Sequence, residues 1–242
     1  RPEDIALVQF SSGSTGEPKG VVVTHAAALV NTAAMAVQFG GTSDSVYLSW
    51  MPLSHDFGVI GFHLTPLCIG VSQLHLPTMR FTRRPTLWMS YAHKYRATML
   101  ASPNFGYEHF LKHYNRDEAE GWDLSCIRTI QNGAEPISAS LARRFLTELS
   151  SKGLRPECMQ AGYGLAEATL GVTGVLPNGG LSTHCVDRNK LGPGAQVRFL
   201  SLEDPSAVEV VDLGPCMNQI AVRITDDRDQ AVPEDTVGRV QI

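Results

Sequence analysis

A loop of small polar residues near the start of the chain could bind the phosphate groups of a nucleotide. It runs from Ser11 to Gly20 as Ser-Ser-Gly-Ser-Thr-Gly-Glu-Pro-Lys-Gly, between two apolar runs rich in β-branched residues. Its glycines let the backbone come close to a ligand, so that loop N–H groups, hydroxyls and the Lys19 ammonium can converge on an anion. It is not a Walker A loop, because Lys19 is followed by Gly20 rather than by Ser or Thr. On composition alone, a mobile surface hairpin fits this stretch equally well.

A histidine and an aspartate follow another strand-like run, in residues 54–58 (Ser-His-Asp-Phe-Gly). Open α/β sheets place ligand-contacting residues at the ends of their strands. His55 could therefore act as a gate to a binding site or donate a hydrogen bond to an anion. A structural histidine held by Asp56 is the alternative.

Two later turns carry residues suited to a nucleotide and a metal ion. In residues 132–136 (Asn-Gly-Ala-Glu-Pro), Gly133 leaves bare backbone on which a planar ring could lie, although a plain strand-to-helix turn explains it as well. Farther along, Tyr163 stands between two glycines and precedes Glu167. A tyrosine ring suits stacking on a base and a carboxylate suits a hard cation such as Mg²⁺, but a lone glutamate is usually just solvated.

The elements that must position these motifs alternate between strand-like and helix-like runs. This alternation predicts an α/β fold, in which a sheet is layered with helices. Thr24 and Asn104 are expected to cap the helices that follow them, as is Ser138 or Ser140. Strands are expected at residues 21–23, 45–50, 71–76, 97–100, 127–131 and 158–160, and helices at 26–38, up to 69, at 85–95, and after 104 and 138.

Beyond residue 171 this helix–strand rhythm breaks. Glycines and prolines mark turns between short strands up to residue 216. An alternating strand is expected at 219–224, a polar turn at 226–229, and a partner strand from 237. The C-terminal part of the chain is therefore predicted to be β-rich.

The composition is that of an ordinary globular protein. Hydrophobic residues make up 43% of the 242 residues and charged residues 18%, and the net charge of −4 gives no support for a nucleic-acid partner or an anionic membrane surface. The longest apolar run, residues 21–37, is interrupted by polar residues, so no transmembrane segment is expected. The five cysteines are far apart and form no CxxC pair, which argues against a zinc site or a disulfide framework and predicts a cytoplasmic location.

In their order and spacing, these motifs resemble those of the adenylate-forming enzymes, the superfamily of acyl-CoA synthetases, adenylation domains of nonribosomal peptide synthetases and luciferases. Residues 11–20 resemble the phosphate loop of that superfamily, and residues 51–58 (Met-Pro-Leu-Ser-His-Asp-Phe-Gly) resemble its next core motif. Residues 132–136 are similar to its adenine-flanking turn, and residues 163–167 to its Tyr-Gly-x-x-Glu segment. Four motifs in the right order make chance a poor explanation.

Within the superfamily, the likeness is strongest to fatty acyl-AMP ligases. The stretches that read like this branch are Phe81-x-x-Arg84-Pro85, residues 101–107, 132–136 and 164–170, and the long tract between Thr169 and Cys216 with Val186-Asp187-Arg188. Fatty acyl-CoA ligases are typically shorter in that tract. Ser54 and Phe57 stand where Tyr and Met are common, and Gly162 stands where Ala is common, so the preferred acyl chain could differ.

The resemblance implies that residues 1–242 are an incomplete large N-terminal AMP-binding domain. Residues 171–216 would form the loop and strand tract of this branch, and residues 217–242 would begin a β-subdomain. A Thr-Gly-Asp ribose motif and a small C-terminal domain with a catalytic lysine belong to the pattern, and neither is in this sequence. The chain is therefore expected to be a piece of a longer protein.

The activity implied by the resemblance is ATP-dependent activation of a fatty acid to acyl-AMP with release of pyrophosphate. The acyl group would then pass to the phosphopantetheine of an acyl carrier protein, in lipid, polyketide or lipopeptide biosynthesis. ATP and Mg²⁺ are the implied cofactors. Two alternatives stay open, namely an acyl-CoA ligase and a nucleotide-binding fragment that is not competent alone.

The same resemblance implies roles for individual residues. Lys19, His55 and Glu167 would be catalytic, and Thr15 and Glu167 would bind Mg²⁺. The residues implied for nucleotide binding are Ser11, Ser12, Gly13, Ser14, Thr15, Gly16, Lys19, Gly133, Ala134, Glu135, Tyr163, Gly164, Leu165 and Ala166. Those implied for the fatty acid are His55, Phe57, Gly58, Asn104, Phe105 and Gly106.

Overall fold

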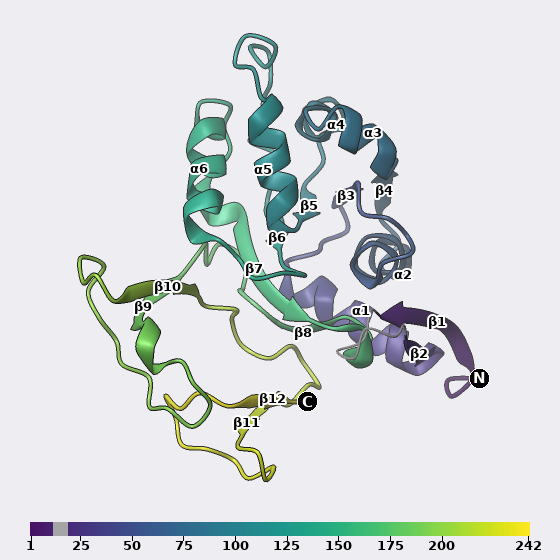
Figure 1. Ribbon diagram of the computed structural model, residues 1–242. Helices are drawn as coiled ribbons and strands as arrows, with labels where there is room; N and C mark the ends of the chain where they lie inside the picture. The colour runs from purple at the N-terminus through teal and green to yellow at the C-terminus, as the bar shows by residue number, and fades with distance from the viewer. Residues whose placement is uncertain (12–18) are drawn as a thin grey trace.

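The computed structural model describes residues 1–11 and 19–242, and its architecture is the α/β fold expected from the sequence. At its centre lies a six-stranded sheet with the strand order β4-β3-β5-β6-β7-β8 (Figure 1). The strands are β3 (Val46–Ser49), β4 (Ser72–His75), β5 (Met99–Ser102), β6 (Thr129–Asn132), β7 (Met159–Gly164) and β8 (Gly171–Gly174). Neighbours are parallel from β4 to β7, and β8 runs antiparallel to β7.

Two groups of helices cover the two faces of this sheet. The first group is α1 (His25–Gln38), the π-helical segment η1 (Phe57–Leu64) and α2 (Thr65–Cys68). The second group is α3 (Thr78–Arg83), α4 (Leu87–Tyr95), α5 (Asn104–His113) and α6 (Ala139–Ser150). Every residue of β5 and β6 is buried, which is typical of parallel strands held between two helical layers.

Aromatic side chains pack the sheet against the first helical layer and the helices of the second layer against one another. On the first face, Tyr47 of β3 packs edge-on against Phe62 of η1. In the second layer, Trp88 of α4 lies against Tyr107 of α5, and Phe145 of α6 packs against the same tyrosine ring. The core is therefore continuous on both sides of the strands that lead to the candidate site.

Two of the predicted helix caps are present. Thr24 Oγ1 accepts the Ala27 N–H at the start of α1, and Ser138 Oγ accepts the Leu141 N–H at the start of α6. Each hydroxyl satisfies a backbone donor that has no partner within the helix. These two helix starts could therefore be predicted from sequence.

The prediction that Asn104 caps α5 is wrong. Pro103 holds the cap position, and the side-chain amide of Asn104 donates instead to the Pro136 carbonyl. The donor that needs a partner, the Phe105 N–H, is bonded by a Glu135 carboxylate oxygen at 2.9 Å. The cap of α5 therefore comes from the turn after β6, which the local sequence around Asn104 cannot reveal.

An antiparallel hairpin opens the chain. It consists of β1 (Ile5–Ser11) and β2 (Lys19–Thr24), and it ends with Ser11 opposite Lys19. The predicted apolar runs on either side of the loop are therefore two paired strands. Of the predicted nucleotide-binding residues, Ser12, Gly13, Ser14, Thr15 and Gly16 lie outside the described residues.

Beyond β8 the chain forms short antiparallel pairs, at the lower left of Figure 1. β9 (Thr183–Asp187) pairs with β10 (Ala207–Val211), and β11 (Arg223–Thr225) pairs with β12 (Arg239–Gln241). Short helical turns also occur in the described part of the chain, before β8 at η2 (Pro156–Cys158) and η3 (Ala166–Ala168), and after β9 at η4 (Arg188–Lys190). The predicted β-rich character is confirmed.

The predicted strand at 219–224 is mostly wrong, because β11 covers only Arg223–Thr225. Gln219 has a left-handed φ of 66°, and the Ile220 N–H closes a turn onto the Met217 carbonyl at 3.1 Å. Strand pairing therefore begins only after this turn. Across residues 1–11 and 19–242, none of the helices combines the length and apolar character needed to cross a bilayer.

Candidate active site

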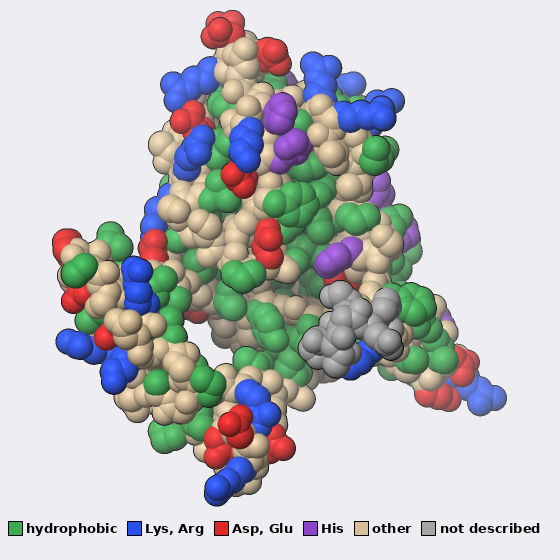
Figure 2. Space-filling model, viewed as in Figure 1, with side chains coloured by type: hydrophobic (Ala, Val, Ile, Leu, Met, Phe, Trp, Pro, Cys, Tyr) green, Lys and Arg blue, Asp and Glu red, His purple; other side chains and the backbone are tan. Residues whose placement is uncertain are grey.

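A cavity of about 200 Å³ lies where β6 and β7 end, between the sheet and the layer of α1 and η1. Its lining residues are Met35, Phe39, His55, Asp56, Phe57, Gln131, Asn132, Gly133, Ala134, Gly162, Tyr163, Gly164, Leu170, Gly171, Thr173 and Met217. Figure 2 shows hydrophobic side chains gathered in the middle of the visible face, with Lys and Arg side chains mainly toward its edges. Because open α/β sheets bind ligands beyond the carboxyl ends of their strands, this cavity is the candidate active site.

One side of the cavity is apolar. Met35 of α1 and Phe39, which caps the C-terminal end of α1, are both only 3% exposed and contribute to this side together with Met217. The Phe39 ring fits because two facing residues have no side chain: a Cβ would lie 3.3 Å from the ring at Gly162 and 2.7 Å from it at Gly174. The cavity can therefore receive a hydrocarbon group against these walls.

The turn after β6 supplies bare backbone and an unpaired amide. A Cβ at Gly133 would lie 2.8 Å from the Gly162 carbonyl oxygen, so the close approach of β6 and β7 requires a glycine there. Ala134 follows with a left-handed φ of 69°. Among the described residues, neither side-chain amide atom of Asn132 has a hydrogen-bond partner, although the residue is only 1% exposed. A buried amide of this kind is costly unless a ligand or water pairs with it.

The segment after β7 leads from the cavity to the first hairpin. Tyr163 lines the cavity, and Glu167 lies four residues later in η3, exposed to solvent. Glu167 Oε1 lies 3.4 Å from Ser11 Oγ, a long hydrogen bond between residues that are 156 positions apart in sequence. Since Ser11 is opposite Lys19 in the hairpin, the fold brings three of the predicted site residues, Ser11, Lys19 and Glu167, close together, and these three are not among the residues that line the cavity.

His55 and Asp56 form a close pair at the mouth of the cavity. His55 Nδ1 lies 2.7 Å from Asp56 Oδ1, and the His55 side chain is half exposed. The hydrogen bond that Asp56 accepts from His55, together with the Asp56 charge, raises the pKa of His55 above its ordinary value, against the opposing effect of burial. The Phe57 N–H lies 3.2 Å from Nδ1 but only 2.6 Å from Asp56 Oδ1. We therefore place the Nδ1 proton toward Asp56, and within residues 1–11 and 19–242 no side chain or backbone group is hydrogen-bonded to Nε2, so this nitrogen can meet a ligand.

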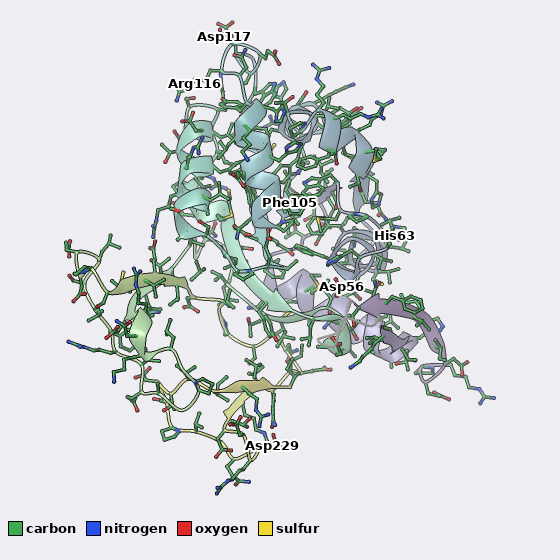
Figure 3. All side chains as sticks on the ribbon, viewed as in Figure 1. Asp56, His63, Phe105, Arg116, Asp117 and Asp229 are labelled. Atoms are coloured by element: carbon green, nitrogen blue, oxygen red, sulfur yellow. The ribbon has the colours of Figure 1, made fainter. Side chains whose placement is uncertain are left out.

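Figure 3 labels Asp56, which caps the start of η1, and Phe105, in the first turn of α5. The burial of Asp56 beside the cavity, together with its contacts to the residues on either side of it, His55 and Phe57, makes it the orienting partner of His55. Of the predicted site residues that the structure describes, those that line the cavity are His55, Phe57, Gly133, Ala134, Tyr163 and Gly164.

Other predicted site residues do not line the cavity but shape its surroundings. A Cβ at Gly58 would lie 2.2 Å from the Pro52 carbonyl oxygen, and one at Gly106 would lie 2.5 Å from the Trp50 ring, so both positions need a glycine for packing. Asn104, Phe105 and Glu135 join the start of α5 to the turn after β6. The Leu165 N–H donates to the Leu170 carbonyl, and Ala166 is buried in η3.

Sequence reasoning missed Met35, Phe39, Gln131, Asn132, Leu170, Gly171, Thr173 and Met217 as lining residues. Apolar residues at helical spacing on α1 look like ordinary core residues, and Met217 lies in a segment without regular periodicity. Asn132 had a usable signal, because it opens a motif whose next residues were predicted to contact a ligand.

The sequence matches the family of AMP-binding enzymes over residues 1–242. The chain belongs to this family. Among AMP-binding relatives, it is 32% identical to a medium-chain-fatty-acid–[acyl-carrier-protein] ligase of Teredinibacter turnerae, over all of this chain and 38% of the relative. It is also 32% identical to a long-chain-fatty-acid–AMP ligase of Mycobacterium marinum, over 86% of this chain and 38% of the relative.

The fold of this AMP-binding chain is likewise similar to that of solved relatives. A crystal structure of a fatty acyl-adenylate ligase from Legionella pneumophila, in complex with acyl adenylate and pyrophosphate, matches with a TM-score of 0.93 and 34% identity. The match covers 99% of this chain and 42% of that one. The chain thus spans about two fifths of the length of the proteins that it matches.

Proposed function

We propose that this chain is the nucleotide- and acyl-binding part of a fatty acyl-AMP ligase, which activates a fatty acid with ATP to give acyl-AMP and pyrophosphate. One observation carries the proposal: a single cavity joins an apolar wall on α1 to the His55–Asp56 pair and to the bare backbone beside Tyr163. A fatty acid needs the apolar wall, and an adenylate needs the histidine–aspartate pair and the bare backbone beside the tyrosine. Fatty acyl ligases among the relatives support the same reading.

In the proposed reaction, a carboxylate oxygen of the fatty acid attacks the α-phosphorus of ATP. The bond from that phosphorus to the oxygen bridging to the β-phosphate breaks, and pyrophosphate leaves with the electron pair. Such a displacement depends on positioning and on neutralising charge rather than on covalent help from the protein. The proposed nucleophile therefore has to be held in line with the phosphate, which a cavity closed on one side by Phe39 would help to do.

The residues around the cavity have matching proposed roles. Tyr163 would stack on adenine, with the Gly133–Ala134 backbone on the opposite face of the ring. His55 would donate from Nε2 to an oxygen at the junction of carboxylate and phosphate, because Asp56 holds Nδ1 and keeps the ring protonated to higher pH. Lys19 would place its ammonium on the departing phosphates.

Ser11 and Glu167 provide a hydroxyl and a carboxylate oxygen 3.4 Å apart, which is the donor chemistry that Mg²⁺ prefers. We infer that Glu167, together with Thr15, would hold the Mg²⁺ that accompanies ATP. When bound, the metal would neutralise charge on the phosphates. Asn132 adds support for a bound ligand, since its buried amide lies at the cavity wall and neither its donor nor its acceptor is paired within the part of the chain that the structure describes.

In the next proposed step, the thiol sulfur of an acyl carrier protein's phosphopantetheine attacks the acyl carbonyl carbon, and AMP leaves. A ligase for acyl-carrier-protein is among the relatives. Coenzyme A offers the same thiol chemistry, so an acyl-CoA ligase is the competing assignment. The two differ only in the carrier of the thiol, which makes them separable by experiment.

The test uses the full-length protein that contains this chain. Exchange of labelled pyrophosphate into ATP is measured with a panel of saturated fatty acids, and acyl-AMP is then offered a carrier protein or coenzyme A in parallel. We expect exchange that depends on a fatty acid, followed by transfer to the carrier protein and not to coenzyme A. Absence of exchange with every fatty acid would refute adenylation, and efficient acyl-CoA formation would refute the ligase branch.

A further inference from the structure

The turn that carries Glu167 has a strained backbone. Leu165 donates its N–H to the Leu170 carbonyl at 2.9 Å, which folds the chain back between β7 and β8. Within this turn, Thr169 has φ of 73° and ψ of −57°. This is the rarer and more strained of the two γ-turn conformations, and a β-branched side chain makes it less favourable still. Such a conformation persists only where surrounding contacts enforce it.

Asn31 of α1 makes contacts that enforce this conformation. Its amide nitrogen donates to the Gly171 carbonyl at 2.9 Å and to the Ala168 carbonyl at 3.3 Å. Its amide oxygen accepts the Gly171 N–H at 3.1 Å. The side chain is buried, and these bonds reach the backbone on both sides of Thr169. One residue of α1 therefore holds a turn that is about 140 positions away in sequence.

The same helix is joined to the hairpin that faces Glu167. Thr24, the last residue of β2, caps α1, and Lys19 begins β2 opposite Ser11. The carboxylate oxygen Oε1 of Glu167 in turn lies 3.4 Å from Ser11 Oγ. Helix α1 is thus bonded both to the hairpin that carries Ser11 and to the turn that carries Glu167.

We propose that Asn31 is a positioning residue, which holds Glu167 within reach of Ser11 so that its carboxylate can meet the Mg²⁺ that accompanies ATP. This inference rests on the proposed function. Asn31 touches neither the cavity nor the reacting atoms, and it acts through the backbone of residues 168–171. Its removal should therefore disturb metal dependence first.

The test compares Asn31→Leu with Gln38→Leu in the full-length protein. Gln38 is a matched control, because it is a buried amide on the same helix that donates to the Gly174 carbonyl of β8, away from the Glu167 turn. Both variants lose a buried amide of similar environment. If Asn31→Leu does not fold, Asn31→Ala takes its place under the same measurements.

The first measurement is hydrogen exchange in the ligand-free protein. We expect the amides of residues 165–171 to exchange about tenfold faster or more in Asn31→Leu, since a hydrogen-bonded turn opens more often once its anchor is lost. Gln38→Leu should leave these amides within about twofold of the wild type. Unchanged protection of this segment in Asn31→Leu would overturn the proposal.

The second measurement is the Mg²⁺ concentration at which ATP binding and pyrophosphate exchange are half-maximal. We expect Asn31→Leu to raise it about fivefold or more, and Gln38→Leu to leave it unchanged. Adding Asn31→Leu to Glu167→Gln should raise it no further, because both changes remove the same contact. If the double variant instead needed a Mg²⁺ concentration raised by the product of the two single effects, the proposal would be overturned. If the wild-type protein showed no fatty-acid-dependent pyrophosphate exchange, that result would count against the proposed function alone. The hydrogen-exchange measurement would still test whether Asn31 holds the turn of residues 165–171.

Discussion

Replacing Phe39 by alanine tests whether the apolar wall of the cavity selects the acyl chain. The ring is 3% exposed, lines the cavity, and lies against the bare backbone of Gly162 and Gly174. Its removal leaves six carbon positions empty, next to the space that we assign to the fatty acid. A longer acyl chain could fill that space without moving the sheet.

The expected size of the effect follows from the burial of methylene groups. Each buried methylene contributes about 0.8 kcal/mol, which is roughly fourfold in kcat/KM. If two more methylenes of a longer chain fit, the preference for that chain over a shorter one should rise about 15-fold in Phe39→Ala. The loss of the ring should also lower the free energy of unfolding by about 3–5 kcal/mol.

The assay is pyrophosphate exchange by the full-length protein, with saturated fatty acids that differ by two carbons. Phe110→Ala is the matched control, because Phe110 is equally buried on α5 but lies outside the cavity lining. It should be destabilised to a similar extent with no change in chain-length preference. An unchanged preference in a folded Phe39→Ala variant would refute the placement of the acyl chain.

Three further predictions concern Glu167, the His55–Asp56 pair and Gly164. Glu167→Gln should lower exchange at least about tenfold and raise the Mg²⁺ requirement, and unchanged metal dependence would remove Glu167 from the metal. Since the pKa of His55 is raised, its pairing with Asp56 should stabilise the fold below about pH 6.5, and this stabilisation should be lost as the pH rises through the raised pKa. Urea unfolding of wild type and Asp56→Asn across this range should give unfolding free energies whose difference becomes smaller as the pH rises. A difference that stays constant with pH would contradict this prediction. In Gly164→Ala, the new Cβ would lie 1.9 Å from the Leu170 carbonyl oxygen, so we expect a loss of about 2 kcal/mol or more in unfolding free energy. Gly121→Ala is its control, since nothing lies within 4 Å of a Cβ there; equal stability of the two variants would refute the argument.

Local signals were enough to predict most of the fold. The alternation of runs marks the strands of the central sheet, and the hydroxyls of Thr24 and Ser138 cap the helices that they precede. The errors occur where a distant contact decides the outcome. The α5 start is capped by Glu135 rather than by Asn104, and the turn at Gln219 ends a pattern that reads as a strand.

In the candidate site too, local sequence signals were enough for some residues, and distant contacts decided the others. Turns with glycines next to functional side chains could be recognised in sequence, and the structure brings His55, Gly133 and Tyr163 to one cavity. Phe39 could not be recognised, because a buried aromatic residue at the end of a helix has the same pattern whether it borders a cavity or solid core. Asn31 could not be recognised either, since its partners lie about 140 residues away.

The most direct test of the central claim is a crystal structure of the full-length protein with a non-hydrolysable acyl-adenylate, such as an acyl sulfamoyl adenosine. We predict that adenine stacks on Tyr163 against the Gly133–Ala134 backbone, while the acyl chain passes His55 and ends against Phe39. An adenylate bound elsewhere, or an acyl chain directed away from this cavity, would contradict the account.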